Sequence, residues 1–325
     1  MTDRALVVVT FAPVDDKMAA DLGDLADLRS TVGLPDDERA RLLDEADVLF
    51  SWNYAKELRP GEGPQLGARF VQLISAGADH LAFGELPPRA VVASNVGAYA
   101  EPMAEHVLAM TLALLKNLPQ GHAKLASGVW DQSMTRQLSG SVCGVLGYGG
   151  IGRATARRMR ALGASIYAVN TSGRSADPVD FVGTLDQLDT VLEAADVVVL
   201  CLPLTRRTRG LIGKGELERM KPDAVLVNVG RGALVVEDAL YDHLRLHPQF
   251  SAGFDTWWGE PFRGGRFTVD RPFFDLPNLI GSPHNSALVP GTLDEALAAA
   301  LSNIRRFLTG EAVTGVVHVE EYVST

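Results

Sequence analysis

The chain has 325 residues, of which 46% are hydrophobic and 22% charged, and its formal net charge at pH 7 is −10. This length exceeds one ordinary core and predicts two domains, and the hydrophobic fraction excludes a largely disordered chain. The negative charge argues against a nucleic-acid or anionic-membrane partner, and no apolar run approaches the ~18 residues of a membrane span.

Two cysteines, Cys143 and Cys201, lie in apolar runs. Buried free thiols are typical of a reducing compartment, so we expect a cytoplasmic protein. The N-terminal residues lack the apolar region of a signal peptide. The chain shows no paired His, Cys or Asp spacing of the kind that structural zinc needs, so no metal is expected.

The first hundred residues alternate short β-type runs with mixed helical segments such as Asp36–Asp44. This alternation predicts a small α/β unit with a parallel sheet. The expected strands are Ala5–Thr10, Ala46–Phe50, Phe70–Ser75 and Val91–Asn95.

The segment Glu101–Leu118 follows, with Pro102 placed for a first helical turn. Its apolar residues occur almost all the way round the predicted helix, which indicates burial on every side. We expect this helix between domains or in a subunit interface.

A second series of apolar runs predicts a doubly wound sheet, because strands this continuously apolar are covered on both faces. The last long helix, Leu293–Leu308, is expected to return to the first unit. The expected strands are Val142–Leu146, Ser165–Asn170, Asp196–Leu202, Ala224–Val229, Ser251–Asp255 and Leu279–Ser282.

A glycine-rich turn follows the first strand of this series and opens a helix. Its Gly147, Gly149 and Gly152 match the spacing of a dinucleotide pyrophosphate site. The first glycine permits the turn, the second lets the backbone approach the phosphates, and the third lets helix pack on strand. Free N–H groups and the helix dipole then face the anion; Gly150 and Ile151 complete the predicted contacts.

Three further segments each lie at or beside the end of a predicted strand: Asn228–Gly232, Phe254–Pro261 and Ser282–Asn285. With an arginine, a glutamate and a histidine in this order, the chain resembles the D-2-hydroxyacid dehydrogenases, in a glyoxylate/hydroxypyruvate reductase-like branch. The resemblance covers nearly the whole chain.

The resemblance implies an α/β fold in which a Rossmann-type doubly wound parallel sheet forms a nucleotide-binding domain beside a flavodoxin-like α/β substrate domain. Residues 1–98 and 289–325 are expected to form the substrate-binding domain and residues 99–288 the dinucleotide-binding domain. By the same resemblance the protein is expected to be a homodimer.

The residue types fit reduction of a 2-oxo acid, which needs a hydride at the carbonyl carbon and a proton at its oxygen. His284 can exchange that proton near neutral pH, and Glu260 would hold its ring and favour imidazolium. Arg231 would bind the substrate carboxylate and polarise the carbonyl through its forked guanidinium. The nicotinamide supplies the hydride.

The loop after the second strand of the series bears on cofactor choice. An NAD-binding member would place a carboxylate there, whereas this chain has Asn170, Thr171, Ser172 and Arg174. Hydroxyls and an arginine suit a 2′-phosphate, so NADP(H) is favoured and NAD(H) is the alternative. By resemblance, further cofactor contacts are Leu202, Pro203, Val229, Gly230 and Asp255.

On the substrate side, Ser75–His80 resembles the family's carboxylate-binding loop, with Ala76, Gly77 and Ala78 as the predicted contacts. Trp52 and Tyr54 would line the substrate and offer apolar surface rather than a cationic phosphate site. The aromatic stretch from Trp257 to Phe274 would form either a lid or a packed surface loop.

Other interpretations remain open. Among enzymes, the alternatives are formate dehydrogenase-type and phosphite dehydrogenase-type branches. By resemblance, the formate branch has a glutamine at the position of Glu260, so Glu260 argues against it. Outside enzymes, the alternative is a non-catalytic, dinucleotide-sensing binding protein like the family's corepressors.

Overall fold

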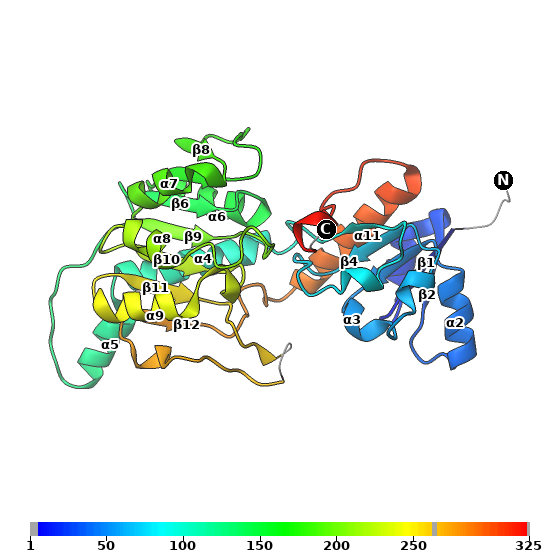
Figure 1. Ribbon diagram of the computed structural model, residues 1–325, viewed down its shortest axis with the longest axis horizontal. Coiled ribbons are helices and arrows are strands. Elements are labelled where there is room, and N and C mark those ends of the chain that lie inside the picture. The colour runs from blue at the N-terminus through cyan, green and yellow to red at the C-terminus, as the bar shows by residue number, and fades with distance from the viewer. Residues whose placement is uncertain (1–5, 262–264, 324–325) are drawn as a thin grey trace. The chain divides into compact units, whose positions relative to one another are not determined.

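The computed structural model describes residues 6–261 and 265–323. The chain divides into two compact units, which are described separately (Figure 1). Unit 1 comprises residues 1–98 and 290–325, and unit 2 comprises residues 99–289.

Unit 1 is built on a five-stranded parallel sheet with the order β2-β1-β3-β4-β5. This order is that of the flavodoxin-like doubly wound sheet, whose ligands bind beyond the carboxyl ends of the strands. The strands are β1 (Leu6–Thr10), β2 (Ala26–Ser30), β3 (Val48–Ser51), β4 (Phe70–Leu73) and β5 (Val91–Ala93), and the helices are α1 (Asp16–Leu22), α2 (Asp36–Asp44), α3 (Tyr54–Glu57) and α11 (Thr292–Thr309).

The last helix, α11, packs within unit 1. Phe307 stacks on Phe70 of β4, with ring centroids 4.6 Å apart. Asn303 donates from Nδ2 to Gln72 Oε1, at 2.7 Å. Because both side chains are buried, this bond satisfies polar groups that the core would otherwise leave unpaired.

Unit 2 is built on a seven-stranded parallel sheet with the order β12-β11-β10-β9-β6-β7-β8. This is the Rossmann order extended by one strand, and its topology reverses between β6 and β9. The strands are β6 (Val142–Leu146), β7 (Ser165–Val169), β8 (Phe181–Gly183), β9 (Val197–Leu200), β10 (Val225–Asn228), β11 (Ser251–Phe254) and β12 (Leu279–Gly281).

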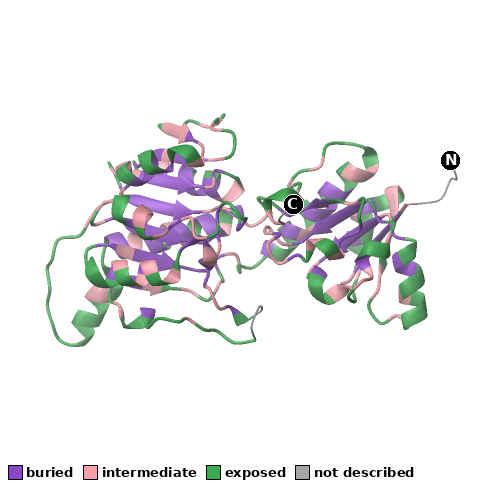
Figure 2. Ribbon diagram, in the orientation of Figure 1, coloured by how far each residue is buried: buried purple, intermediate pink, exposed green. Residues whose placement is uncertain are grey.

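Helices and short 3-10 segments surround the sheet of unit 2, and the strands are buried between them (Figure 2). The helices are α4 (Ala100–Leu115), α5 (Leu118–Ala126), α6 (Gly150–Ala161), α7 (Leu188–Ala194), α8 (Lys214–Arg219) and α9 (Glu237–Leu246). The 3-10 segments of the described residues are Gly23–Leu25, Gly63–Gln65, Phe83–Glu85, Leu185–Gln187, Gly232–Leu234, Phe273–Asp275 and Val319–Glu321.

The helix expected over Glu101–Leu118 differs from the prediction. It ends at Leu115, and a second helix begins at Leu118 after Asn117 takes a left-handed conformation with φ of 49°. Asparagine tolerates this region better than most residues, so it can separate the two helices. Within the chain, α4 is not buried on every side, because Glu101 and Glu105 are exposed.

The two parallel α/β sheets confirm the predicted fold class. Two strands were missed: β2, whose side chains alternate in exposure at a sheet edge, and the three-residue β8. Among the residues that the structure describes, no helix combines the length and apolarity needed to cross a bilayer.

Candidate active site

The glycine loop joins β6 to α6, and two of its glycines have no room for a side chain. Gly147 has φ of 96°, and a Cβ there would lie 2.7 Å from the backbone of Cys201 and Leu202. A Cβ on Gly152 would lie 2.2 Å from Gly147 O. These contacts explain the first and third glycines by close packing of backbone.

The middle glycine is different, because a Cβ on Gly149 would meet nothing within 4 Å. Gly149 is the N-cap of α6, so the loop leaves open space beside the first free N–H groups of that helix. A pyrophosphate fits a space of this kind at a helix N-terminus. The residues present therefore fit the phosphates of a dinucleotide.

The loop after β7 is organised by Asn170. Its Oδ1 accepts hydrogen bonds from Ser172 N at 3.0 Å and Gly173 N at 2.7 Å, and its Nδ2 donates to Arg174 O at 2.8 Å. Asn170 therefore fixes the loop and is not free to bind a ligand with that oxygen. Thr171 and Arg174 are exposed on the loop, and their side chains are the ones available to an anion.

The next carboxylate along the chain, Asp177, is already paired. Arg153 of α6 forms a two-pronged ion pair with it, with Nε–Oδ2 at 2.6 Å and Nη2–Oδ1 at 3.0 Å. This bidentate geometry uses both carboxylate oxygens. Asp177 therefore does not replace the missing carboxylate at the end of β7.

The loop after β9 carries Leu202 and Pro203 next to the glycine loop. Leu202 is half-buried against the core and Pro203 is exposed. Thr208 donates from Oγ1 to Pro203 O at 2.6 Å, which holds the loop in shape. The two residues thus present apolar surface beside Gly147, on the far side of the topological switch from the Asn170 loop.

Sheet register brings the loops of the predicted catalytic residues together. Asn228 of β10 pairs with Phe254 of β11, and Phe254 pairs with Gly281 of β12. Arg231 and His284 each lie three residues beyond these aligned positions. The three loops therefore leave one edge of the sheet from neighbouring strands.

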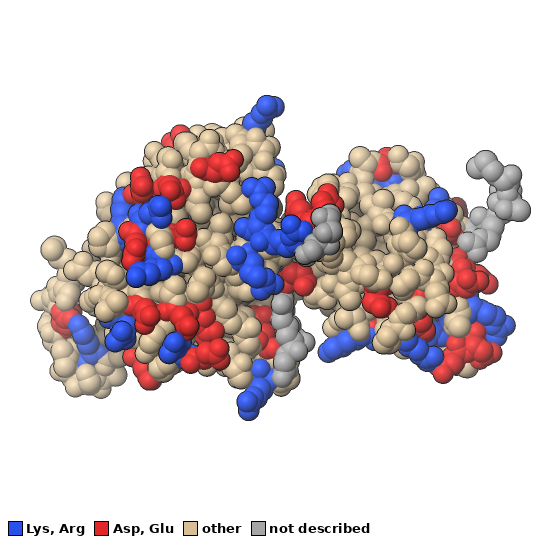
Figure 3. Space-filling view, in the orientation of Figure 1, with Lys and Arg blue, Asp and Glu red and all other residues tan. Residues whose placement is uncertain are grey.

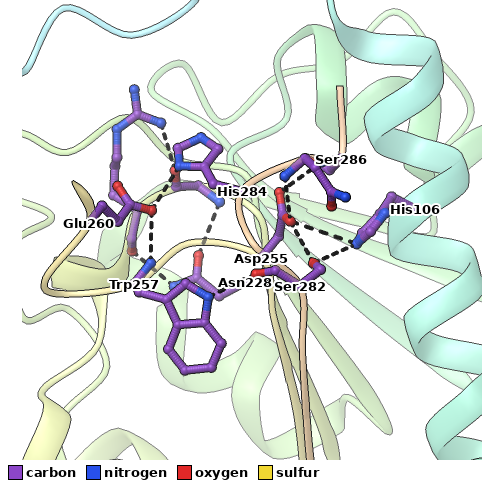
Figure 4. Close-up of polar contacts among 11 residues, drawn as sticks. His106, Asn228, Asp255, Trp257, Glu260, Ser282, His284 and Ser286 are labelled. Carbon is purple, nitrogen blue, oxygen red and sulfur yellow. Dashed lines mark hydrogen bonds and ion pairs between the residues drawn. The ribbon is translucent and has the colours of Figure 1, made fainter. Parts of the chain in front are cut away.

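His284 and Glu260 are in direct contact (Figure 4). His284 Nδ1 lies 2.7 Å from Glu260 Oε1, and the carboxyl side chain is only 3% exposed while the imidazole is 30% exposed. The carboxylate therefore fixes the orientation of the imidazole ring. His284 also has φ of 54°, a left-handed conformation that needs support from its surroundings.

That support comes from Asp255, which is fully buried at the end of β11. Its carboxylate accepts bonds from Asn285 N at 3.0 Å, Ser286 N at 3.1 Å and Ser282 Oγ at 2.5 Å. Burial alone would raise the pKa of Asp255, but these bonds outweigh it and hold the pKa below its ordinary value. Asp255 thus fastens the loop on both sides of His284.

His106 of α4 joins the same network, which the sequence did not indicate. Its Nε2 lies 2.9 Å from Ser282 Oγ and 3.8 Å from Asp255 Oδ1 (Figure 4). A protonated His106 would offset the buried negative charge of Asp255. The predicted contact between Asp255 and a cofactor has to share a carboxylate whose oxygens already hold the His284 loop.

The Arg231 loop is held by Asn228. Asn228 Nδ2 donates to Arg231 O at 2.9 Å, and Asn228 Oδ1 accepts from Gly230 N at 3.0 Å. A Cβ on Gly230 would lie 2.7 Å from Leu234 Cδ1 and 2.9 Å from Leu202 O. This crowding explains why glycine precedes Arg231. Val229, the residue before Gly230, is buried.

In unit 1, the loop after β3 corrects one prediction. Tyr54 is 2% exposed, and its hydroxyl donates to Glu85 O at 2.9 Å. Burial raises the pKa of Tyr54, in keeping with a core side chain. Tyr54 therefore offers no surface to a substrate, whereas Trp52 is partly exposed on the loop, which Glu57 folds by accepting from Trp52 N and Asn53 N.

The loop after β4 places Ala76 and Gly77 partly exposed at the same edge of unit 1, while Ala78 is buried. Ser75 Oγ donates to Gly77 O at 2.8 Å and fixes the turn. Ala78 contributes at most its backbone to a ligand.

The described part of the aromatic stretch after β11 packs against the loop that precedes His284. Phe262 and the next two residues lie outside the described residues. Thr268 N donates to Gly259 O at 2.9 Å, which joins Thr268 to the residue before Glu260. Trp257 lies 5.5 Å from Phe267 and 5.2 Å from Phe274 between ring centroids. These contacts favour the packed-loop interpretation.

The family profile described as "D-isomer specific 2-hydroxyacid dehydrogenase, NAD binding domain" matches residues 108–286, more than half of the chain. The chain belongs to this family.

Named relatives extend the match. The glyoxylate/hydroxypyruvate reductase B of Pectobacterium carotovorum is 32% identical over 77% of this chain and 79% of its own. The D-3-phosphoglycerate dehydrogenase of Methanocaldococcus jannaschii is 28% identical over 94% of this chain, but the chain spans only 58% of that relative. A D-isomer specific 2-hydroxyacid dehydrogenase from Xanthobacter autotrophicus, solved with NADPH and MES, superposes with a TM-score of 0.78 at 25% identity, covering 97% of this chain and 98% of its own.

Proposed function

We propose that this protein is an NAD(P)H-dependent reductase that converts a small 2-oxo acid reversibly to a D-2-hydroxy acid. The observation that carries the proposal is the 2.7 Å contact between His284 Nδ1 and buried Glu260, in a loop beside that of Arg231. This set suits proton transfer to a carbonyl next to a carboxylate. The family membership gives the reaction class.

The proton path follows from the contact. Nδ1 of His284 contacts Glu260, and we assign the proton transfer to the other ring nitrogen, Nε2. It donates its proton to the carbonyl oxygen as the carbonyl carbon gains a hydride, and the resulting alcohol carries both atoms. Glu260 stabilises the protonated ring before transfer. Arg231 binds the substrate carboxylate and orients the carbonyl.

A nicotinamide dinucleotide, when bound, supplies the hydride. The open space at Gly149 and the α6 N-terminus would hold its pyrophosphate, with Gly147, Gly150, Ile151 and Gly152 shaping the loop. Leu202 and Pro203 would lie by the adenosine, and Val229, Gly230 and Asp255 along the nicotinamide. We assign residues 99–288 to dinucleotide binding and residues 1–98 with 289–325 to substrate binding.

NADP(H) is the proposed cofactor. The loop after β7 lacks a carboxylate, Asp177 is bound to Arg153, and Thr171 and Arg174 are exposed on that loop. A 2′-phosphate would find a hydroxyl and a cation there, and a carboxylate would repel it. The NADPH in the Xanthobacter relative is in keeping with this proposal.

The substrate class follows from the loop after β3. Ser51, Trp52 and Asn53 carry no positive charge, and the first cation after them along the chain is Lys56 of α3. We infer a substrate with an uncharged side chain, of glyoxylate or hydroxypyruvate size or a bulkier apolar oxo acid. Trp52, Ala76, Gly77 and the backbone of Ala78 would contact it. A phosphoglycerate substrate is disfavoured despite the named relatives.

The protein is proposed to be a homodimer. The described residues of α5 and the segment after it expose apolar side chains, a feature typical of protein interfaces. The interface predicted over Glu101–Leu118 therefore extends toward residue 134; light scattering that shows a monomer at micromolar concentration would contradict it. The exposed side chains are Leu118 (59%), Leu125 (57%), Val129 (50%), Trp130 (78%) and Met134 (95%).

Charge and thiols support the remaining proposals. Both units carry acidic and basic side chains on the face that Figure 3 shows, and the net charge is −10, so no nucleic-acid or membrane partner is proposed. Cys143 and Cys201 are free thiols, and burial raises the pKa of each to about 12. Unreactive thiols of this kind fit the cytoplasm.

The test is initial-rate oxidation of NADPH and of NADH against a panel of 2-oxo acids, with His284→Ala as the control. Turnover that the variant loses would support the reductase and identify its cofactor and substrate size. A protein that binds NADPH tightly but reduces no oxo acid would overturn the proposal in favour of a dinucleotide sensor. Formate or phosphite oxidation without oxo-acid reduction would instead favour those branches.

A further inference from the structure

Trp257 lies at the junction of the loops that carry Glu260 and His284. Its backbone N donates to Glu260 Oε1 at 3.0 Å, the same oxygen that contacts His284 Nδ1 (Figure 4). Its indole Nε1 donates to Ser282 O at 2.9 Å, two residues before His284. Trp257 therefore bonds directly to Glu260 and, through a different group, to the loop that carries His284.

Trp257 is also closely packed against two of the neighbouring loops. The side chain is 5% exposed, and its ring lies against Gly281 of β12, where a Cβ would be 2.5 Å from Trp257 Cζ2. Its backbone lies against Gly232, where a Cβ would be 2.3 Å from Trp257 C. Gly232 directly follows Arg231, so Trp257 also contacts the third catalytic loop.

The next residue braces that third loop. Trp258 Nε1 donates to Val235 O at 2.8 Å, in the loop that follows Arg231, and its ring stacks on Phe273. The two tryptophans thus bond to different loops. Trp257 bonds to Glu260 and to the loop before His284, and Trp258 bonds to the loop after Arg231.

The indole of Trp257 makes one hydrogen bond, to the loop that carries His284, while the bond to Glu260 comes from the backbone N of Trp257. The left-handed backbone of His284 needs support from its surroundings. After the histidine, Asp255 binds the backbone N–H groups of Asn285 and Ser286; before it, Asp255 binds the side-chain Oγ of Ser282 rather than the backbone. The indole bond to Ser282 O fixes the backbone before the histidine. Loss of that bond would let the imidazole move relative to Glu260.

We propose that Trp257 is a positioning residue that holds His284 against Glu260 in the geometry required for proton transfer. This inference rests on the proposed reductase function. Trp257 does not touch the reacting atoms, and its effect is transmitted through the Glu260 carboxylate and the Ser282 backbone.

The experiment compares Trp257→Phe with Glu260→Gln and wild type. The phenylalanine variant keeps an aromatic ring but loses the indole N–H. We expect kcat to fall roughly 10- to 100-fold, as for a small misplacement of a catalytic group. The KM for the oxo acid stays close to wild type because Arg231 is unchanged. The pH profile of kcat/KM shifts toward that of Glu260→Gln.

Matched controls separate positioning from packing. Phe274→Leu removes another ring that touches Trp257 but no hydrogen bond, and it is expected to keep the wild-type pH profile. Trp258→Phe is expected to raise KM through the Arg231 loop instead. If Trp257→Phe folds poorly, Gly281→Ala places a Cβ 2.5 Å from Trp257 Cζ2, so it displaces the same indole and should reproduce the kcat and pH effects.

A second readout does not depend on turnover. The His284 side-chain ¹⁵N signals, assigned by their loss in His284→Ala, are titrated by NMR in wild type, Trp257→Phe and Glu260→Gln. The inference predicts that Trp257→Phe moves the titration toward that of Glu260→Gln. If wild type reduces no oxo acid, the proposed function fails while this titration still decides the role of Trp257. Wild-type titration and pH profile in Trp257→Phe would overturn the inference, as would an equal kcat loss in Phe274→Leu.

Discussion

Replacing Gly149 with alanine should weaken dinucleotide binding while leaving the fold intact. Gly149 has φ of −94° and ψ of −151°, which an L-residue adopts readily, and a Cβ there meets no protein atom within 4 Å. The added methyl group would instead enter the space proposed for the pyrophosphate. Binding and stability are therefore expected to separate at this position.

The magnitudes follow from these contacts. Alanine is a poorer N-cap than glycine by up to about 1 kcal/mol, and it offsets this by restricting the unfolded chain by about 0.4–1 kcal/mol. The free energy of unfolding should therefore change by less than about 1 kcal/mol. Crowding the phosphates by one methyl group costs about 1–3 kcal/mol, which corresponds to a Kd for NADPH that is roughly 5- to 150-fold higher.

The matched control is Gly152→Ala, in the same loop. Its Cβ would lie 2.2 Å from Gly147 O and 3.0 Å from Val145 Cγ1, so backbone has to move. We expect a loss of about 2 kcal/mol of stability and a Tm lower by roughly 4–8 °C.

The assays are NADPH titration by calorimetry and thermal unfolding without cofactor. Wild-type affinity in Gly149→Ala would refute the placement of the pyrophosphate at this glycine. A large fall in its Tm would show that the space is needed for folding instead.

Three further predictions concern single side chains. Arg174→Ala should lower kcat/KM for NADPH by roughly tenfold and leave that for NADH unchanged, because a charge-assisted bond of about 1.5 kcal/mol is lost; equal effects on both cofactors would exclude a 2′-phosphate contact. Thr256 Oγ1 is buried without a hydrogen-bond partner among the described residues, so Thr256→Val should raise stability by about 1 kcal/mol, measured by urea unfolding; a loss of that size would reveal a partner. Burial and the neighbouring His247 lower the pKa of His243 to about 4. The unfolded chain therefore binds the proton first, and stability is lost as pH falls from about 6.5 toward 4. His243→Gln should lose less Tm over that range, and an unchanged pH dependence would contradict this assignment.

The sequence predicts those parts of the fold that depend on continuous apolar runs and on the spacing of glycines. The runs that became β6 and β9 are buried on both faces, and the turn between β6 and α6 needs Gly147 for its positive φ. The three loops at one sheet edge follow from parallel strands in register. Their order along the chain therefore predicts that the loops of Arg231 and His284 leave the same edge of the sheet.

The sequence does not predict the features that depend on contacts between residues far apart along the chain, or on strands without an apolar run. The edge strand β2 alternates exposed and half-buried residues and has no apolar run to mark it. Tyr54 looks like a surface aromatic until Glu85 O is found to accept its hydroxyl. The roles of His106 and Trp257 depend on hydrogen bonds to Ser282, which lies at the end of another strand.

Unit 1 is assembled from two stretches of chain separated by the whole of unit 2. Its β5 backbone accepts a bond from Val317 N to Val92 O at 2.8 Å, and Asn95 Nδ2 donates to Ala296 O of α11 at 2.8 Å. During synthesis, the ribosome delivers residues 290–325 only after unit 2 has been made. Domains generally fold as they emerge, from the N-terminus onward.

In this protein, unit 1 cannot complete its fold when its first residues emerge, because it also needs residues 290–325, which are synthesised last. The nascent strands β1 and β3–β5 remain without their α11 cover while some two hundred further residues are added, at about 5–20 residues per second. For roughly 10–40 s, the apolar surface that α11 later covers is open to chaperones and to neighbouring chains. A truncation that removes α11 should therefore harm yield more than a deletion of equal length at an exposed loop.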